Sequence, residues 1–123
     1  MRIQHLKAGH LLPAYTGFLR YDPSWVWVVM DGENMVAALI AAPAHDTVLL
    51  LELLRFGEVS GDWIGSLLKQ VARECRERGF DRVMTWLSDA RPEERKLRKV
   101  METYGGRAET FSGVVMAGEI HHV

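Results

Sequence analysis

The segment of residues 47–87 constrains the fold more than any other part of the chain. It begins with an apolar run from Thr47 to Phe56, passes through a turn of small residues and continues as an amphipathic helix. The helix carries one apolar stripe, formed by Ile64, Leu67, Leu68, Val71 and Cys75. Gly79 is a typical helix stop, and Arg82–Leu87 is typical of a strand. Because a strand reached through a helical crossover pairs in parallel, the segment predicts a β-α-β unit.

The turn that opens this helix favours the binding of an anion. Its candidate residues are Ser60, Gly61, Asp62, Trp63, Gly65 and Ser66. The first amides of a helix have no intrahelical acceptor, and the helix dipole adds partial positive charge there, so a phosphate or pyrophosphate is the natural ligand. Trp63 leaves two interpretations open. Its indole either stacks on the ligand or flanks its phosphates, or it plugs the groove as a core residue.

Composition limits what this unit can belong to. The chain has 123 residues, of which 48% are apolar and 25% charged, so we expect one folded domain over residues 1–123. The net charge of -1 gives no global field that would attract nucleic acid or an anionic membrane. Cys75 is the only cysteine, which excludes an intrachain disulfide and favours a reducing, cytoplasmic setting. No apolar run has the length that a membrane span needs.

The N-terminal region predicts a short strand at Ile3–Lys7 and a helix between about Gly9 and Arg20. The helix prediction rests on apolar residues at helical spacing, with Pro13 in the first turn. These residues are Leu11, Leu12, Tyr15, Phe18 and Leu19. Tyr21–Ser24 contains a proline and should end the helix.

A three-strand antiparallel meander is predicted next. Ser24–Met30 and Met35–Ala42 flank the turn residues 31–34, which is the pattern of a hairpin, and the run from Thr47 to Phe56 adds a third strand. These strands are apolar on both faces. We therefore expect helices to cover both sides of the sheet.

The C-terminal region predicts one more helix and one more strand. The helix begins near Pro92, after Asp89, and ends at Gly105-Gly106. Its apolar stripe consists of Leu97, Val100, Met101 and Tyr104. The final strand covers Phe111–Ile120. The predicted fold class is therefore a mixed α/β sheet, with a meander and a helical crossover to a parallel strand.

From the hairpin to the end, this order of elements resembles the GNAT superfamily of acyl-CoA-dependent N-acyltransferases. The resemblance is carried by four stretches: Asp31-Gly32, Gly61-Asp62-Trp63-Ile64-Gly65-Ser66-Leu67-Leu68, Arg76-Glu77-Arg78-Gly79-Phe80 and Tyr104-Gly105. In the family's pyrophosphate loop, Gly61 and Gly65 match, whereas Ser60 replaces an Arg or Gln and Trp63 replaces a Gly.

The resemblance implies an acetyl-CoA site and an open sheet. The pantetheine of the cosubstrate would lie beside Leu54, Arg55 and Phe56, with the pyrophosphate on the amides of Ser60–Gly65. The third meander strand and Arg82–Leu87 should diverge at their C-terminal ends and leave a cleft there.

Three departures from the family pattern bear on mechanism. Glu94 stands where the family often has an Asn, and Met101 stands where a Tyr protonates the departing thiolate. Methionine cannot donate a proton, so that step needs another group or water. The N-terminal region has room for one helix where the family places two that help to form the acceptor pocket.

Glu52 interrupts the leucines of the third strand and is the candidate catalytic residue. A carboxylate inside a covered strand is costly unless it is paired or faces a cleft. It serves either as the general base that deprotonates an amine or as the partner of a basic residue on a neighbouring strand or at a subunit edge.

The remaining reactive residues favour structural roles. Cys75 lies on the apolar stripe and is expected to be a buried small residue. The histidines are scattered without metal-ligand spacing, so no metal site is predicted. Basic residues between Arg91 and Lys99 alternate with glutamates, which is typical of a solvated helix face rather than a nucleic-acid surface. Trp25, Trp27 and Trp86 suit a core or a subunit interface.

We therefore expect transfer of an acetyl group from acetyl-CoA to an amine on a small molecule or peptide. An inactive GNAT-fold binding or assembly protein is the alternative, and nucleic-acid binding through the basic helix ranks third. Exposed sheet edges in a short chain also favour a homodimer.

Overall fold

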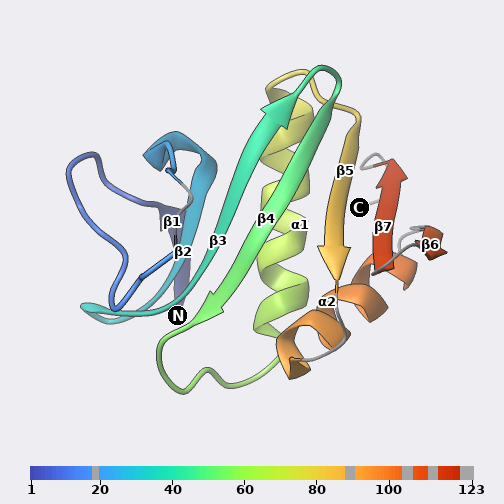
Figure 1. Ribbon diagram of the computed structural model, residues 1–123. Helices are drawn as coiled ribbons and strands as arrows, with labels where there is room; N and C mark the ends of the chain where they lie inside the picture. Colours follow the sequence, from blue (N-terminus) through green and yellow to red (C-terminus); the bar gives the residue numbers. More distant parts are fainter. Residues whose placement is uncertain (18–19, 88–90, 104–106, 111–113, 120–123) are drawn as a thin grey trace.

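A computed structural model describes residues 1–17, 20–87, 91–103, 107–110 and 114–119. Seven strands form one sheet in the order β1-β2-β3-β4-β5-β7-β6, with two α-helices packed against it (Figure 1). The strands are β1 (Arg2–His5), β2 (Val26–Asp31), β3 (Asn34–Ala44), β4 (Thr47–Arg55), β5 (Arg82–Leu87), β6 (Arg107–Thr110) and β7 (Val114–Glu119). The helices are α1 (Trp63–Glu77), α2 (Pro92–Thr103) and a short 3-10 turn, η1 (Pro23–Trp25).

The predicted meander is confirmed. β2, β3 and β4 pair antiparallel in sequence, and Asp31 pairs with Asn34 around a two-residue loop. Gly32 has a φ of +59° in that loop. Such a left-handed conformation is what two-residue hairpin turns require and what glycine adopts without strain.

The predicted crossover is confirmed as well. β4 leads into α1, and β5 returns parallel to β4. Gly79 has a φ of +94°, which places it as the left-handed residue just after the helix. The mixed sheet therefore contains one parallel pair, between β4 and β5, inside an otherwise antiparallel order.

Both α-helices cover the same face of the sheet. The larger of the two buried clusters joins inward residues of β2–β5 to Ile64, Leu67 and Val71 of α1 and to Leu97 and Met101 of α2. Figure 1 shows α1 crossing behind β3 and β4, with α2 beside the lower ends of α1 and β5. The apolar stripes of the two helices thus share one core.

On the opposite face, the irregular N-terminal segment covers β2, β3 and the end of β4. Leu6 and Leu12 pack there with Val26, Val28 and Ile40. The expected helix between Gly9 and Arg20 is wrong, since the described residues of that segment form turns and extended chain.

Backbone conformation explains why that helix does not form. Gly9 and Ala14 have φ values of +84° and +51°, and Ala14 directly follows Pro13 in a turn. Leu12 is buried while its neighbour Leu11 is 81% exposed. The apolar residues therefore have helical spacing without sharing a helix face, and the second face of the sheet lacks the helix expected there.

One carboxylate links α1 to the first two strands. Glu74 Oε1 lies 2.8 Å from His5 Nε2, and Trp27 Nε1 donates a hydrogen bond of 2.6 Å to Glu74 Oε2. A pairing of Glu74 with Arg78 is expected from their spacing, but the guanidinium of Arg78 lies instead over the ring of Trp25, 3.5 Å from its centroid.

The C-terminal predictions are met in part within the described residues. α2 begins at Pro92 as expected, whereas Tyr104, Gly105 and Gly106 lie outside the described residues. β7 falls inside the predicted strand Phe111–Ile120, whose ends are also outside them. β6 has no counterpart in the prediction. Among the described helices, none has the length and apolarity needed to cross a membrane.

Candidate functional site

The two parallel strands separate halfway along their length. Their pairing runs from Thr47 and Arg82 to Leu50 and Thr85, while β4 continues to Arg55. At the last pair, Thr85 Oγ1 donates a hydrogen bond of 3.0 Å to the carbonyl of Leu50. The expected divergence of these strands is therefore confirmed, and it opens the sheet beside the second half of β4.

A β-bulge decides which way Glu52 points. Ile40 pairs with Glu52, but the next residue of β3, Ala41, pairs with Leu50, so Leu51 is an extra residue in β4. Residues opposite each other in neighbouring strands share a face. Ile40 belongs to the cluster under the N-terminal segment, and Glu52 lies on that same face. Without the extra residue, the register would turn Glu52 toward the helices.

Glu52 borders a small cavity between the diverging strands. Its Oε2 atom is buried and has no hydrogen-bond partner among the described residues. The cavity has a volume of about 30 Å³, and its lining includes Leu53 and Leu97 from the helical side as well as Leu51 and Trp86. A space of this size holds one water molecule or one amino group. A buried oxygen without a partner, on a residue that borders such a space, favours a hydrogen-bond donor there.

Charged side chains from the start of α2 span the same opening. The guanidinium of Arg91 donates a hydrogen bond to the carbonyl of Leu53. Arg55 Nε lies 2.8 Å from Glu93 Oε1, and Arg91 Nε lies 3.9 Å from Glu93 Oε2. These contacts tie the free end of β4 to the first turn of α2.

The electrostatics of Glu93 follow from these contacts. Its pKa is lowered, first by the hydrogen bond from its own backbone N–H and then by the guanidinium groups of Arg55 and Arg91, while partial burial acts in the opposite direction. The carboxylate is therefore held in its charged form between two arginines.

The start of α1 is closed by a side chain of its own. Gly61 has a φ of +73°, and the carboxylate of Asp62 accepts a hydrogen bond of 3.2 Å from the amide of Gly65. A Cβ atom on Gly65 would overlap that carboxylate. Asp62 is thus the N-cap of α1, and an anion would compete with it for the amide of Gly65.

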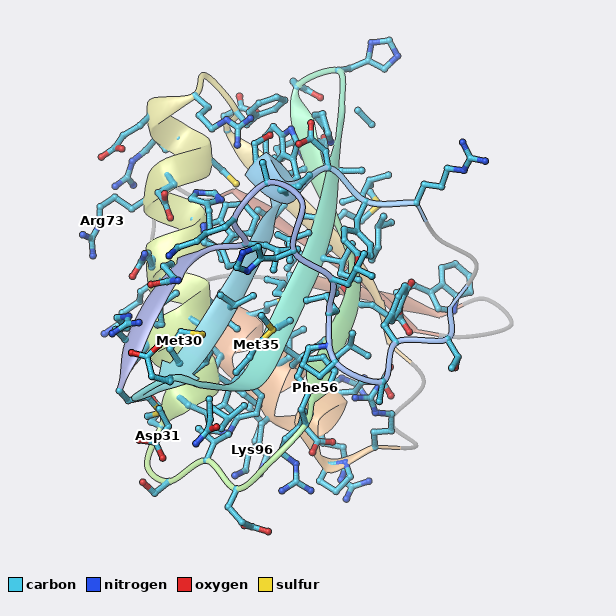
Figure 2. All side chains as sticks on the ribbon, turned by 90° about the vertical axis from the view of Figure 1, so that its left-hand side faces the viewer. Met30, Asp31, Met35, Phe56, Arg73 and Lys96 are labelled. Atoms are coloured by element: carbon cyan, nitrogen blue, oxygen red, sulfur yellow. The ribbon has the colours of Figure 1, made fainter. Side chains whose placement is uncertain are left out.

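Two further cavities meet at the start of α1. One, of about 470 Å³, is bordered by Gly61, Asp62, Lys96 and Lys99, and the other, of about 170 Å³, by Arg55, Glu93 and Lys96. Trp63 and Ile64 line both. Figure 2 shows Lys96 near the loop between β4 and α1, at the end of the molecule where β4 finishes. Two ammonium groups therefore flank the helix start.

The predicted cosubstrate residues are divided between these places. Arg55 borders the cavity beside α2, and Gly61, Asp62 and Trp63 border the larger one. Leu54 and Phe56 pack instead on the face of the N-terminal segment (Figure 2). Gly65 is buried in α1, and Ser60 and Ser66 are exposed. Trp63 is 5% exposed and belongs to the larger core cluster, which is the arrangement of the plug interpretation.

Four residues of the site were not singled out from the sequence. They are Glu93, Lys96 and Lys99 of α2, and Arg91, which directly precedes this helix. The sequence interpretation assigned their basic run to a solvated face. The spacing of Lys96 and Lys99 puts them on one side of the helix, but only the packing of α2 on α1 brings that side to Gly61.

Two other side chains have structural roles. Met101 is buried in the core cluster. Burial raises the pKa of the Cys75 thiol to about 12, so Cys75 is a buried thiol as expected and not a thiolate nucleophile. Within the ranges given above, no group of three His, Cys, Asp or Glu side chains is placed to hold a metal ion.

No family model and no curated protein sequence matches the chain. Solved structures do. The ribosomal-protein-S18-alanine N-acetyltransferase of Escherichia coli superposes with a TM-score of 0.72 at 16% identity, over 97% of this chain and 93% of that one. A GNAT family acetyltransferase of Elizabethkingia anophelis with acetyl-CoA bound gives 0.68 at 14% identity, over 96% and 97%.

The PaiA N-acetyltransferase of Thermoplasma acidophilum, in complex with coenzyme A, gives a TM-score of 0.63 at 11% identity, over 76% of this chain and 59% of that one. Two of these structures superpose over nearly the whole of this chain. The protein has the fold of the GNAT acetyltransferases.

Proposed function

We propose that the protein transfers an acyl group, most simply acetyl, from acetyl-CoA to an amine, with Glu52 as the general base. The observation that carries the proposal is the buried, unpaired Oε2 atom of Glu52 at a cavity between the diverging strands of a GNAT fold. An amine must lose a proton as it attacks a thioester, and a carboxylate beside it accepts that proton.

The residues around the start of α1 suit the phosphates of the cosubstrate. Lys96 and Lys99 offer two positive charges beside helix amides, and the cavity of about 470 Å³ that they border is in the size range of ligand sites. The Asp62 carboxylate opposes an anion at the same place. The lysines, more than the loop amides, are therefore assigned the phosphate contacts.

The leaving thiolate must gain a proton as the amide bond forms and the thioester bond breaks. Met101, at the position of the family's tyrosine, is buried and has no proton to give. Solvent is the proton source in this proposal, and the exposed surface of the opening gives it access.

A calorimetric titration with acetyl-CoA tests cosubstrate binding. The double variant Lys96→Ala/Lys99→Ala removes two exposed charges and should weaken binding by about tenfold or more at low salt, since charge-assisted hydrogen bonds to a phosphate contribute on the order of 1 kcal/mol each. Arg73→Ala, which removes an exposed charge on the outer side of α1, is the control (Figure 2). Equal affinities of all three proteins for acetyl-CoA would contradict the proposal that the two lysines contact its phosphates.

A second candidate is a GNAT-fold protein that binds without catalysing. The N-cap carboxylate of Asp62 favours it because that carboxylate competes with an anion for the amide of Gly65. The buried Met101 favours it because methionine stands where the family's tyrosine gives a proton. Absence of any heat with acetyl-CoA at millimolar concentration, for a folded protein, supports this candidate over the enzyme.

A further inference from the structure

The second half of β4 and the end of β5 present an apolar strip beside Glu52. β-Sheet residues alternate between faces, and the pairs Leu50–Thr85 and Val48–Val83 point to the helical side. Leu49, Met84 and Trp86 therefore lie on the opposite face, the one that carries Glu52. Leu51, the extra residue of the bulge, joins them at the opening.

The described N-terminal segment leaves this strip open. Its cluster is made with β2, β3 and the end of β4, and Figure 1 shows residues 6–17 and 20–22 beside β1 and β2, on the far side of β3 from β5. Trp86 is 55% exposed and Leu51 37% exposed. Both residues line the cavity that Glu52 also lines. One opening is thus lined by two exposed apolar residues and by a glutamate whose buried Oε2 atom has no donor among the described residues.

We infer that the acceptor is a primary amine carried on an apolar group, with its nitrogen at Glu52 and its apolar group on Trp86 and Leu51. This inference rests on the proposed function, since it names the substrate class of that same site. The negative charge of Glu52 complements an ammonium group, and the cavity of about 30 Å³ has room for the nitrogen but not for the rest of the molecule. The remainder must therefore lie outside, on the strip.

The chemistry of the strip selects against a second charge. An ammonium at the far end of the acceptor would lie over Leu51 and Trp86, where its desolvation is costly. Glu94 also lines the opening, but the guanidinium of Arg91 lines it as well and offsets the attraction of that carboxylate for a second ammonium. A methyl group at the same place removes apolar surface from water on both partners. Selection should therefore favour a monoamine over a diamine of the same length.

Hexylamine and hexamethylenediamine form a matched pair of probes, alike in length and in the reacting end. With acetyl-CoA and the full chain, kcat/KM should be about tenfold or more higher for hexylamine, the lower end of what apolar contacts supply in specificity. Trp86→Ala should remove most of that preference. Leu11→Ala, which removes the most exposed leucine at a place away from the opening, should leave it unchanged.

Tryptophan fluorescence separates this inference from the proposed function. Trp86 is exposed, whereas Trp25, Trp27 and Trp63 are buried, so the binding of hexylamine on the strip should shift emission to shorter wavelength in the parent and not in Trp86→Ala. A shift without acetyl transfer would refute the enzyme and support the strip as an amine site. Transfer to both amines at equal kcat/KM would support the enzyme and overturn the inference. Absence of both the shift and the transfer would overturn both.

Discussion

Arg91 donates a hydrogen bond to the main-chain carbonyl of Leu53, across the opening where β4 and β5 have parted. An extended ligand that lies along β4 needs the same main-chain groups, because those groups face no strand on that side. The guanidinium therefore occupies a place that the pantetheine of acetyl-CoA would take in the proposed complex.

Removal of that side chain should strengthen cosubstrate binding. We expect Arg91→Ala to raise the affinity for acetyl-CoA by roughly two- to tenfold, the value of one hydrogen bond of about 0.5–1.5 kcal/mol. Titration calorimetry measures it, with Arg73→Ala as the control for loss of a positive charge. Weaker binding by Arg91→Ala alone would mean that Arg91 contacts the ligand instead of excluding it.

Asp62 and Gly65 should show strong coupling in a double-mutant cycle. Asp62→Ala removes the N-cap of α1 and should cost about 0.5–2 kcal/mol in the free energy of unfolding. Gly65→Ala displaces the same carboxylate, so it should also destabilise the parent.

In the Asp62→Ala background the effect of Gly65→Ala should reverse, since alanine exceeds glycine in helix propensity by about 1 kcal/mol. Urea unfolding of the four proteins gives the cycle. Additive effects of the two changes would contradict the cap geometry.

Much of this architecture could be predicted from the sequence, because local sequence patterns determine where these strands and helices begin and end. The hairpin around Gly32 and the helix that ends before Gly79 each combine a clear spacing of apolar residues with a glycine in a left-handed conformation. The apolar residues after Gly9 have helical spacing too, but the helix predicted there is wrong. Ala14 adopts a left-handed conformation, which the sequence pattern does not predict for an alanine.

The site depends on strand register and helix packing, which the spacing of residues along the sequence does not predict. The bulge at Leu51 fixes the face of Glu52, and it arises from the register between two strands, not from either strand alone. The contribution of Lys96 depends on the packing of α2 against α1. Glu52 could be singled out because a carboxylate among leucines is costly, whereas the lysines on an exposed helix carry no comparable signal.

Replacement of the candidate base should stabilise the fold. Glu52 Oε2 is buried and has no donor among the described residues. Such an atom costs about 1–3 kcal/mol, so Glu52→Leu should raise the free energy of unfolding by about 1 kcal/mol. Glu58→Leu, the same change at an exposed glutamate in the loop after β4, is the comparison. A loss of stability in Glu52→Leu would indicate that the carboxylate is satisfied in the folded protein.

Acid should loosen the link between β4 and α2. The pKa of Glu93 is lowered in the folded protein from its ordinary value of 4.5, so its stabilising contribution is present above that value and is lost as the pH falls through the lowered pKa. Glu93→Gln should therefore reduce the difference in unfolding free energy between neutral pH and the acid range below the ordinary value. Urea unfolding at a series of pH values measures this, and identical pH profiles for the parent and Glu93→Gln would contradict it.

The most direct test of the account is the rate of acetyl transfer to hexylamine by the parent and by Glu52→Gln, each saturated with acetyl-CoA. Glutamine keeps the shape of the side chain but cannot accept the proton, and the loss of a general base lowers rates by about 10²–10⁴-fold. We predict a fall in kcat of that size, with acetyl-CoA binding retained. Transfer by Glu52→Gln at the parent's rate, or no transfer to any amine by a parent protein that binds acetyl-CoA, would contradict the account.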